Sequence, residues 1–172
     1  MNNKIGFSIF FLVQFFSATV SAGDVTIPDA IKVPDGNSAY LTVYAKGDQI
    51  FHCVLKTGAY SWKWHAPEAK LYDTQNQILV GSHGAGPSWA YKDGSGVKAK
   101  GIQKTDAPEK SAAPWLLLEV TEHKGEGLLG KASFIQRINT QGGVAPLSGC
   151  DANHLGAEKR VPYSADYVFF KK

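Results

Sequence analysis

The stretch Phe134-Ile-Gln-Arg-Ile-Asn-Thr-Gln-Gly-Gly-Val-Ala-Pro-Leu-Ser-Gly-Cys150 contains the strongest cluster of structural signals in the chain. Its aromatic and β-branched residues favour a strand, and the pair Gly142-Gly143 permits positive φ angles. Pro146 ends ladder pairing, so the backbone has to turn here and bring Cys150 to a fixed place. The stretch therefore predicts how the fold is fastened, and no catalytic motif accompanies it.

The N-terminal segment has the features of an export signal. Lys4 precedes an apolar run over residues 5–13 that is too short to span a membrane comfortably, and Val20-Ser-Ala22 supplies small residues before a cleavage point. We predict cleavage after Ala22, a single mature domain over residues 23–172, and a periplasmic or secreted location without membrane insertion. An uncleaved N-terminal anchor is the alternative.

Charge and length narrow the classes of function. Removing residues 1–22 takes away one lysine, so 18 − 1 = 17 basic residues face 15 acidic ones, a net charge of +2 on 172 − 22 = 150 residues. This balance gives no electrostatic reason for a nucleic-acid partner. A chain of this length forms about one domain and can bury a core without help from a metal.

The two cysteines of the chain, Cys53 and Cys150, are predicted to form one disulfide, because an exported chain reaches an oxidising compartment. The bond would hold the segment after Gly142 onto the strand predicted over residues 49–56. A loop of this length restricts the unfolded chain by about 4–5 kcal/mol in the chain-entropy model. The alternative is a shared metal, although neither cysteine lies in a C-x-x-C pair.

Short strands with alternating side chains follow one another along the mature sequence. Residues 39–46 and 49–56 are two such runs, separated by a turn predicted at Gly47-Asp48, and the second places Phe51, Cys53 and Leu55 on one inward face. Residues 115–123 are apolar at consecutive positions, which indicates burial on both faces of a strand.

About ten short strands with Gly/Pro turns, and no amphipathic helix of three turns, predict an all-β fold. The architecture expected is an antiparallel β-sandwich with one disulfide, and a closed β-barrel is the alternative. The order of the strands stays open.

A set of short sequence pieces spread over about residues 51–170 forms a specific collective pattern. The pieces are Trp64 with Ala69 and Leu71, His83 with Gly86-Pro87 and Trp89, Asp93-Gly-Ser95, Pro114-Trp-Leu-Leu-Leu118, Ile135-Gln-Arg137, Asn139-Thr140, Gly142-Gly143, Ala145-Pro146, Cys150, and Tyr163-Ser-Ala-Asp-Tyr167. Together they resemble an exported family that is catalogued only as a domain of unknown function and occurs in bacteria, fungi and plants. The resemblance implies an exported all-β domain and supplies no reaction, cofactor or catalytic residue.

A search for common catalytic and nucleotide-binding motifs does not identify a function. The sequence contains no G-x-S-x-G, H-E-x-x-H or G-x-x-x-x-G-K-[ST]. Gly125-Glu-Gly-Leu-Leu-Gly130 matches G-x-G-x-x-G, but the residues that follow are typical of a strand, whereas the dinucleotide fingerprint has to open a helix. We therefore predict no cofactor.

An enzymatic alternative rests on His65, His83 and Asp93, each of which adjoins a predicted turn. Loops at the end of a sheet bring such residues together, so we expect these three near one another at one end of the fold. They are the candidate catalytic residues of a hydrolase or metal-dependent oxidoreductase. His65 and His83 are also the candidate metal ligands, but scattered histidines are more often surface or hydrogen-bonded groups, and we predict no metal site.

Glu119 lies in the apolar strand predicted over residues 115–123, so a buried position would require a partner for its charge. Arg137 on a neighbouring strand is the natural candidate. The sequence thus predicts a buried ion pair between Glu119 and Arg137 with a structural role.

Aromatic residues supply the candidate ligand-binding groups. Tyr60, Trp62 and Trp64 alternate as core residues of a sheet do, while Trp89, after Gly86-Pro87, is the better candidate for exposure. Exposed rings of Trp64, Trp89 and Tyr91 would stack on a sugar or another flat ligand. The function predicted is a non-catalytic binding module for an envelope or extracellular ligand, either a small molecule or a glycan.

Overall fold

Eight antiparallel strands make up almost all regular structure in the computed structural model, which describes residues 25–74 and 77–172. The predicted signal segment, residues 1–22, lies outside the described residues. Three single-turn 3-10 helices are η1 (Asp29–Ile31), η2 (Leu129–Lys131) and η3 (Ala152–His154). The strands are β1 (Ser38–Lys56), β2 (Ala59–Asp73), β3 (Leu79–Gly84), β4 (Ser88–Tyr91), β5 (Gly96–Thr105), β6 (Trp115–Lys124), β7 (Phe134–Gly142) and β8 (Glu158–Lys171).

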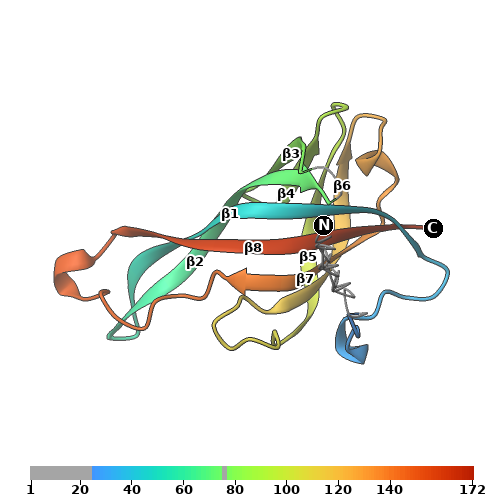
Figure 1. The fold of residues 1–172 in the computed structure, drawn as a ribbon. Helices are drawn as coiled ribbons and strands as arrows, with labels where there is room; N and C mark the ends of the chain where they lie inside the picture. Colours follow the sequence, from blue (N-terminus) through green and yellow to red (C-terminus); the bar gives the residue numbers. More distant parts are fainter. Residues whose placement is uncertain (1–24, 75–76) are drawn as a thin grey trace, which may run out of the picture.

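Each strand pairs with the next one in sequence, and β8 pairs with β1, so the sheet closes into a barrel (Figure 1). The antiparallel all-β class is confirmed, and of the two architectures expected the strand pairing is that of the closed barrel. With up-and-down pairing, the connections after β1, β3, β5 and β7 lie at one end of the barrel, and those after β2, β4 and β6 lie at the other. We call these the open end and the plugged end.

The described residues contain eight strands instead of the ten predicted, because β1 and β2 run through positions that resemble turns. Gly47 was predicted to end a strand, yet it lies inside β1 directly opposite Ala69. A Cβ atom at this position would lie 2.1 Å from the carbonyl oxygen of Glu68. The glycine therefore permits a close approach of two strands, which sequence alone does not distinguish from a turn.

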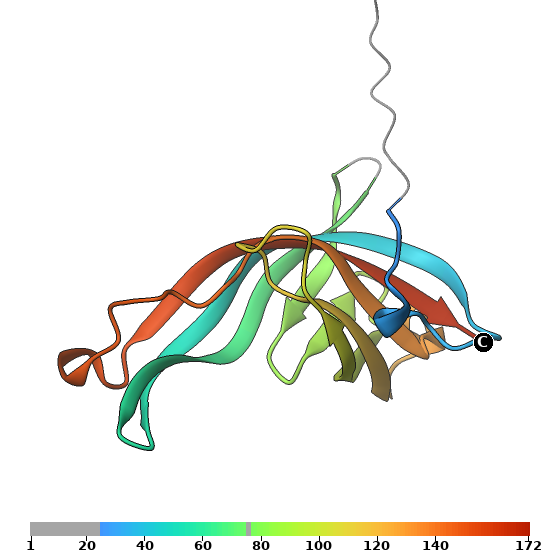
Figure 2. The same ribbon diagram turned by 90° about the horizontal axis from the view of Figure 1, so that it is seen from below.

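The hairpin of β1 and β2 extends beyond the barrel as an arm, which we define as residues 51–64 (Figures 1 and 2). It begins at a register shift after Ile50, where His65 is the extra residue on β2. Such a bulge bends a strand and strengthens its twist. The connection from β7 to β8, residues 143–157, lies at the same end as the tip of the arm in both views.

Two apolar clusters lie on opposite sides of the barrel wall. Inside, Leu118 packs with residues such as Ile135, Phe169 and Trp89. Outside, Trp115 and Leu117 pack against Ile31 of the N-terminal segment. The alternating residues of β6 thus enter different clusters, which confirms the prediction of burial on both faces.

The plugged end is closed by residues 125–131, which insert Leu129 into the interior cluster. Asp93 and Ser95 hold this segment: a carboxylate oxygen of Asp93 accepts from the Leu128 N–H at 2.8 Å, and the Ser95 hydroxyl accepts from the Leu129 N–H at 3.1 Å. Among the described residues, no helix combines the length and the apolar character needed to cross a membrane.

Candidate ligand-binding site

A cavity of about 410 Å³ lies in the lumen at the open end of the barrel. Every one of the eight strands contributes at least one side chain or backbone segment to it, and the connections at the open end form its rim. Eight-stranded barrels have an interior of about the size that holds one small ligand. The lining residues used below are Gln49, Phe51, Trp64, His83, Trp89, Leu116, Leu118, Arg137, Val144 and Tyr167.

Strand register brings the aromatic floor of the cavity together. Trp89 of β4 lies directly opposite His83 of β3 on one side and Val97 of β5 on the other. The rings of His83 and Trp89 are stacked with centroids 4.3 Å apart. Tyr167 of β8 meets both rings edge-on, at 4.9 Å from His83 and 5.3 Å from Trp89. Offset and edge-to-face contacts of this kind are the preferred ones for aromatic rings.

His83 is a neutral hydrogen-bonding group in this floor. Its Nδ1 lies 2.8 Å from the carbonyl oxygen of Ser88, which can only accept, so Nδ1 carries the proton and Nε2 is the ring's acceptor. Burial lowers the pKa of His83 to about 3, and the positive charge of Arg137 acts in the same direction. The ring is therefore uncharged at neutral pH.

Arg137 of β7 faces the lumen between Leu116 of β6 and Tyr167 of β8. Its Nε and Nη2 donate to the carbonyl oxygen of Pro114 at 3.2 and 2.8 Å, which fixes the guanidinium at the rim. Within residues 25–74 and 77–172 no carboxylate oxygen lies within 4.0 Å of it. A positive charge without a counter-ion thus lines the cavity.

The predicted buried ion pair between Glu119 and Arg137 is not formed. Arg137 is opposite Leu116, and Glu119 lies three positions farther along β6, opposite Phe134, so the two side chains point to different faces of the sheet. Glu119 binds Lys100 on the outer surface, with an oxygen to Nζ distance of 3.0 Å. The two residues do occupy neighbouring strands, but the alternation of the pleat separates them.

Several buried polar atoms near the cavity form no hydrogen bond of good geometry within the described part of the chain, although the hydroxyls of Tyr163 and Tyr167 interact with each other, the first also with Gln49 and the second with Arg137. They are Nε2 of Gln49, Nε1 of Trp89 and the hydroxyls of Tyr163 and Tyr167. Burial raises the pKa of both tyrosines, while the positive charge of Arg137 partly opposes this effect, so both phenols keep their protons. Each of these atoms can donate a hydrogen bond, and leaving a buried donor unpaired costs about 1–3 kcal/mol.

The glycine pair of the opening stretch shapes the rim. Gly143 has a φ angle of +80°, and a Cβ atom there would lie 2.8 Å from Cβ of Tyr163 and 3.1 Å from Cγ of Gln49. Only a residue without a side chain fits between these two walls. Gly143 thereby brings the connection 143–157, with Val144, over the lumen.

His65, His83 and Asp93 do not converge. His83 lines the lumen near the open end, whereas Asp93 lies in the turn after β4, at the plugged end. His65 is exposed at the bulge of β2, where its ring stacks on that of His52 at 4.2 Å. The described residues contain no group of three or more His, Cys, Asp or Glu side chains that could hold a metal ion.

The three candidate aromatic residues have different positions. Trp64 is 44% exposed and lines the cavity, with its Nε1 donating to Oε1 of Gln49. Trp89 also lines the cavity but is only 2% exposed, so the prediction of exposure was wrong. Its ladder partners direct the ring inward, although a Gly-Pro loop precedes it. Tyr91 is half-buried against the interior cluster and does not reach this cavity.

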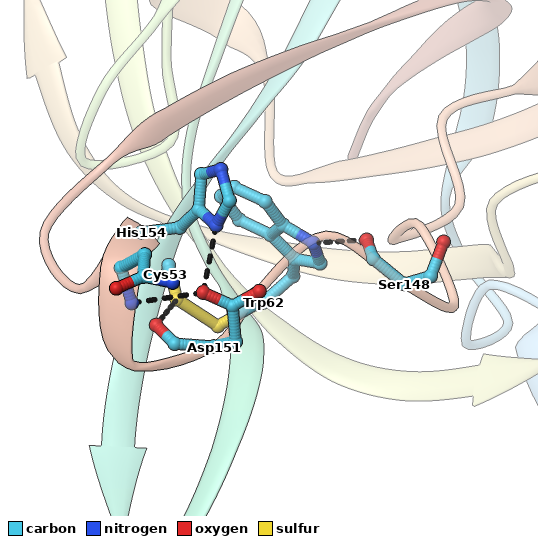
Figure 3. A network of polar contacts seen from close by, with 7 residues as sticks. Cys53, Trp62, Ser148, Asp151 and His154 are labelled. Atoms are coloured by element: carbon cyan, nitrogen blue, oxygen red, sulfur yellow. Dashed lines mark hydrogen bonds and ion pairs between the residues drawn. A yellow bond between two sulfur atoms is a disulfide. The ribbon is translucent and has the colours of Figure 1, made fainter.

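The predicted disulfide between Cys53 and Cys150 is confirmed, with Cα atoms 5.3 Å apart (Figure 3). It fastens the connection 143–157 to the arm, as expected. Backbone bonds between Cys53 and residues 156 and 157 and a 2.8 Å bond from Nε1 of Trp62 to the Ser148 carbonyl oxygen reinforce it. The same connection forms part of the cavity rim, so the disulfide also holds the rim in place.

Gln49, Tyr163 and Tyr167 are lumen residues that sequence reasoning did not single out, and Arg137 was singled out only as the partner of Glu119. For the tyrosines a signal was present, because Tyr163, Ala165, Tyr167 and Phe169 alternate and all are buried. No local pattern places Arg137 in the lumen, since a charged residue between apolar ones is equally typical of an exposed face.

A family model described as "Protein of unknown function (DUF3455)" matches residues 34–171 of the chain. No curated protein and no solved structure matches it.

Proposed function

We propose that this chain, which belongs to the DUF3455 family of proteins of unknown function, is an exported, non-catalytic binding protein whose lumen takes a small acidic ligand. The observation that carries the proposal is the donor-rich lining of the cavity. Arg137 has no counter-ion among the described residues, and the buried indole N–H of Trp89 has no acceptor there.

An acceptor that carries negative charge suits these groups best. Nε and Nη2 of Arg137 each donate one N–H to Pro114, and the guanidinium carries five N–H groups, so further N–H groups remain to donate to a ligand. Hydrogen bonds to charged groups contribute about 1.5–3 kcal/mol each, more than those between neutral groups. A carboxylate or a similar oxyanion satisfies the guanidinium and the neighbouring donors together.

The other walls of the cavity are apolar and can contact an apolar part of the ligand. Phe51, Leu116, Leu118 and Val144 line the cavity beside the aromatic floor. At about 30 Å³ per water-sized group, the volume of 410 Å³ has room for roughly a dozen non-hydrogen atoms. The ligand proposed is therefore a small organic acid with an aromatic or aliphatic body.

A larger hollow of about 1010 Å³ on the barrel supports a ligand less well. Some of its charged groups bind one another, since Lys98 pairs with Glu122 at 2.8 Å and Arg160 pairs with Glu68 at 2.9 Å. Its other lysines, Lys46, Lys70 and Lys124, are exposed, so water solvates their charges and they are not buried donors of the kind found in the lumen.

The proposal also covers the location of the protein and the class of its ligand, both of which were predicted from the sequence. A disulfide that fastens the rim of the site is stable in an oxidising compartment, which supports the periplasm or the exterior as the place of action. A glycan ligand stays a prediction. An acidic sugar meets the same requirement for an anionic acceptor, whereas a neutral one does not.

The experiment is calorimetric titration of the oxidised mature protein with benzoate and with benzamide, its uncharged analogue. We expect benzoate to bind and Arg137→Gln to weaken it about tenfold or more, the loss of one hydrogen bond to a charged group. Arg160→Gln is the matched control, because it removes the same charge from the outer surface. Equal affinities for the two probes, or an equal effect of both variants, would contradict the proposal. Binding of neutral oligosaccharides without any acid would contradict it as well.

A further inference from the structure

We infer that the acidic ligand also carries a peptide group, and that this group pairs with the main chain of Gly101 at a free edge of β5. The inference rests on the proposed function and names the ligand class more closely, as an N-acylated amino acid or a short peptide with a free carboxylate. It follows from a gap in the strand pairing beside the cavity, which we call the side mouth and define by Pro67, Pro87 and Gly101.

The side mouth exists because two strands are much shorter than their neighbours. β3 has 6 residues and β4 has 4, whereas β2 has 15 and β5 has 10. Toward the open end, β2 is paired with β3 only as far as Ala69, and β5 is paired with β4 only as far as Lys98. Pro67, Pro87 and Gly101, which border the gap, all line the cavity in the lumen, so the gap opens into it.

The β2 side of the mouth offers no main-chain donor at its edge. The N–H of Asp73 donates to Ile78 on the β3 side, and alternate residues of a strand direct their main-chain groups to the same side. Pro67, six positions away, therefore faces the mouth. Proline has no N–H and is typical of an edge position of this kind.

The β5 side, in contrast, presents both a donor and an acceptor. The N–H of Ala99 donates to the carbonyl oxygen of Pro87 at 3.1 Å, so by the same alternation the N–H and C=O of Gly101 point into the mouth and away from β6. Neither group bonds to another backbone group of residues 25–74 and 77–172. Gly101 is exposed, and a Cβ atom there would meet no atom within 4 Å. A glycine in a strand is typical of a site where a ligand or another backbone approaches closely.

The edge of β5 is suited to a single peptide group and not to a long added strand. The register shifts directly after Gly101, where Ile102 is the extra residue on β5. Bulges and lysines interrupt continued pairing at an edge, and Lys100 and Lys104 flank this position. A peptide group that pairs with an exposed edge gains main-chain hydrogen bonds, and here only Gly101 supplies them.

The same ligand can reach Arg137. Gly101 lies opposite Leu118 and Arg137 lies opposite Leu116, so β6 alone separates their strands. At about 4.8 Å per strand and about 3.3 Å per residue, the Cα atoms of Gly101 and Arg137 are roughly 12 Å apart. The arginine side chain covers part of this distance, so the carboxylate binds at Arg137 and the acyl group points to the side mouth.

The first test compares N-benzoylglycine with O-benzoylglycolate, in which an ester oxygen replaces the N–H, by titration of the oxidised mature protein. The ester cannot donate to the Gly101 carbonyl oxygen, so we expect it to bind about fivefold more weakly. N-benzoylglycylglycine and its ester analogue repeat the comparison over a longer span. Gly101→Pro, which removes the N–H at an edge, should weaken N-benzoylglycine about fivefold, and Gly101→Ala, which keeps the N–H, should retain most of the affinity.

The second test is amide exchange of Gly101 measured by NMR, which needs no variant. N-benzoylglycine at saturation should slow this exchange tenfold or more, whereas benzoate, which has no peptide group, should not. The N–H of Lys100 points to β6 and serves as the internal reference.

The outcomes separate the inference from the proposal on which it rests. If amide and ester bind equally well at both lengths, or if no N-benzoyl acid slows exchange at Gly101, the peptide group does not pair there, while the lumen site stands on its binding of benzoate. If no acid binds, both fail. If exchange at Gly101 slows with protein concentration in the absence of ligand, the edge pairs with a second copy and the inference is overturned.

Discussion

The imidazole of His83 lies parallel to the indole of Trp89, with their planes 16° apart, and both rings are buried in the floor of the lumen. The pair is set by direct opposition of the two residues on β3 and β4. His83 is held by the Ser88 carbonyl oxygen and is uncharged, so it contributes packing and a hydrogen-bond acceptor. This relationship, together with Arg137 at the rim, defines the polarity of the site.

The neutral state of His83 predicts a loss of stability in acid. Its pKa is about 3 in the folded protein and 6.5 in the unfolded chain, so below pH 6.5 the unfolded state binds one more proton. The free energy of unfolding should then fall by roughly 1.4 kcal/mol per pH unit between about pH 6 and pH 3. Urea denaturation across this range measures the slope. His83→Gln should remove the part of this slope that comes from protonation of His83. An unchanged slope in the variant would show that His83 is not the group responsible.

Loss of the disulfide should both lower the stability of the protein and loosen the rim of the site. Cys53→Ser should destabilise the protein by about 2–5 kcal/mol, which corresponds to a fall in melting temperature of roughly 5–15 °C for a domain of this size. Hydrogen exchange should become faster in residues 143–157 and stay slow in the plug, residues 125–131. Uniform acceleration in both segments would indicate that the bond does not act locally on the rim.

Substituting alanine for Gly143 should cause a steric clash, and the same substitution at Gly149 serves as the control that separates this clash from the backbone cost. Gly143 and Gly149 have nearly the same φ, +80° and +81°, but a Cβ atom meets Tyr163 at 2.8 Å only at position 143. Alanine at either site costs about 1 kcal/mol for the left-handed backbone, and Gly143→Ala should cost a further ~1–3 kcal/mol for overpacking. Chemical denaturation measures the difference, and equal losses in the two variants would argue against the close approach.

Asp93 predicts a role in the plugged end. Hydrogen bonds from the Leu128 and Ser95 N–H groups and from the Ser95 hydroxyl lower the pKa of its carboxyl. Asp93→Asn should weaken these bonds and speed hydrogen exchange in residues 125–131, with benzoate binding at the open end unchanged. A large loss of benzoate affinity, with the plug still protected, would assign Asp93 to the site instead.

The fold was largely predictable because the information lies in local patterns. The period of two along residues 49–56, the apolar run from Trp115 and the cysteine pair correctly predicted an antiparallel all-β domain with one disulfide. The number of strands was not predictable, because a glycine such as Gly47 is compatible both with a turn and with a close approach of two strands, and the sequence does not distinguish the two. Closure of the barrel depends on pairing between β1 and β8, at opposite ends of the described chain.

The site was predictable only in part, because it depends on register. Trp64 and His83 were both singled out by residue type, and both line the cavity. The faces of Glu119 and Arg137 follow from which residue of β6 lies opposite Arg137, and no local pattern states this. Trp89 looked exposed because of the Gly-Pro loop before it, whereas its neighbours across the sheet direct it inward.

The most direct test of the central claim is a crystal structure of the oxidised mature protein with 4-iodobenzoate, in which anomalous scattering locates the iodine. The account predicts one iodine peak in the lumen and the carboxylate within hydrogen-bond distance of the Arg137 guanidinium. An iodine peak only on the outer surface, or a carboxylate turned away from Arg137 toward solvent, would contradict it.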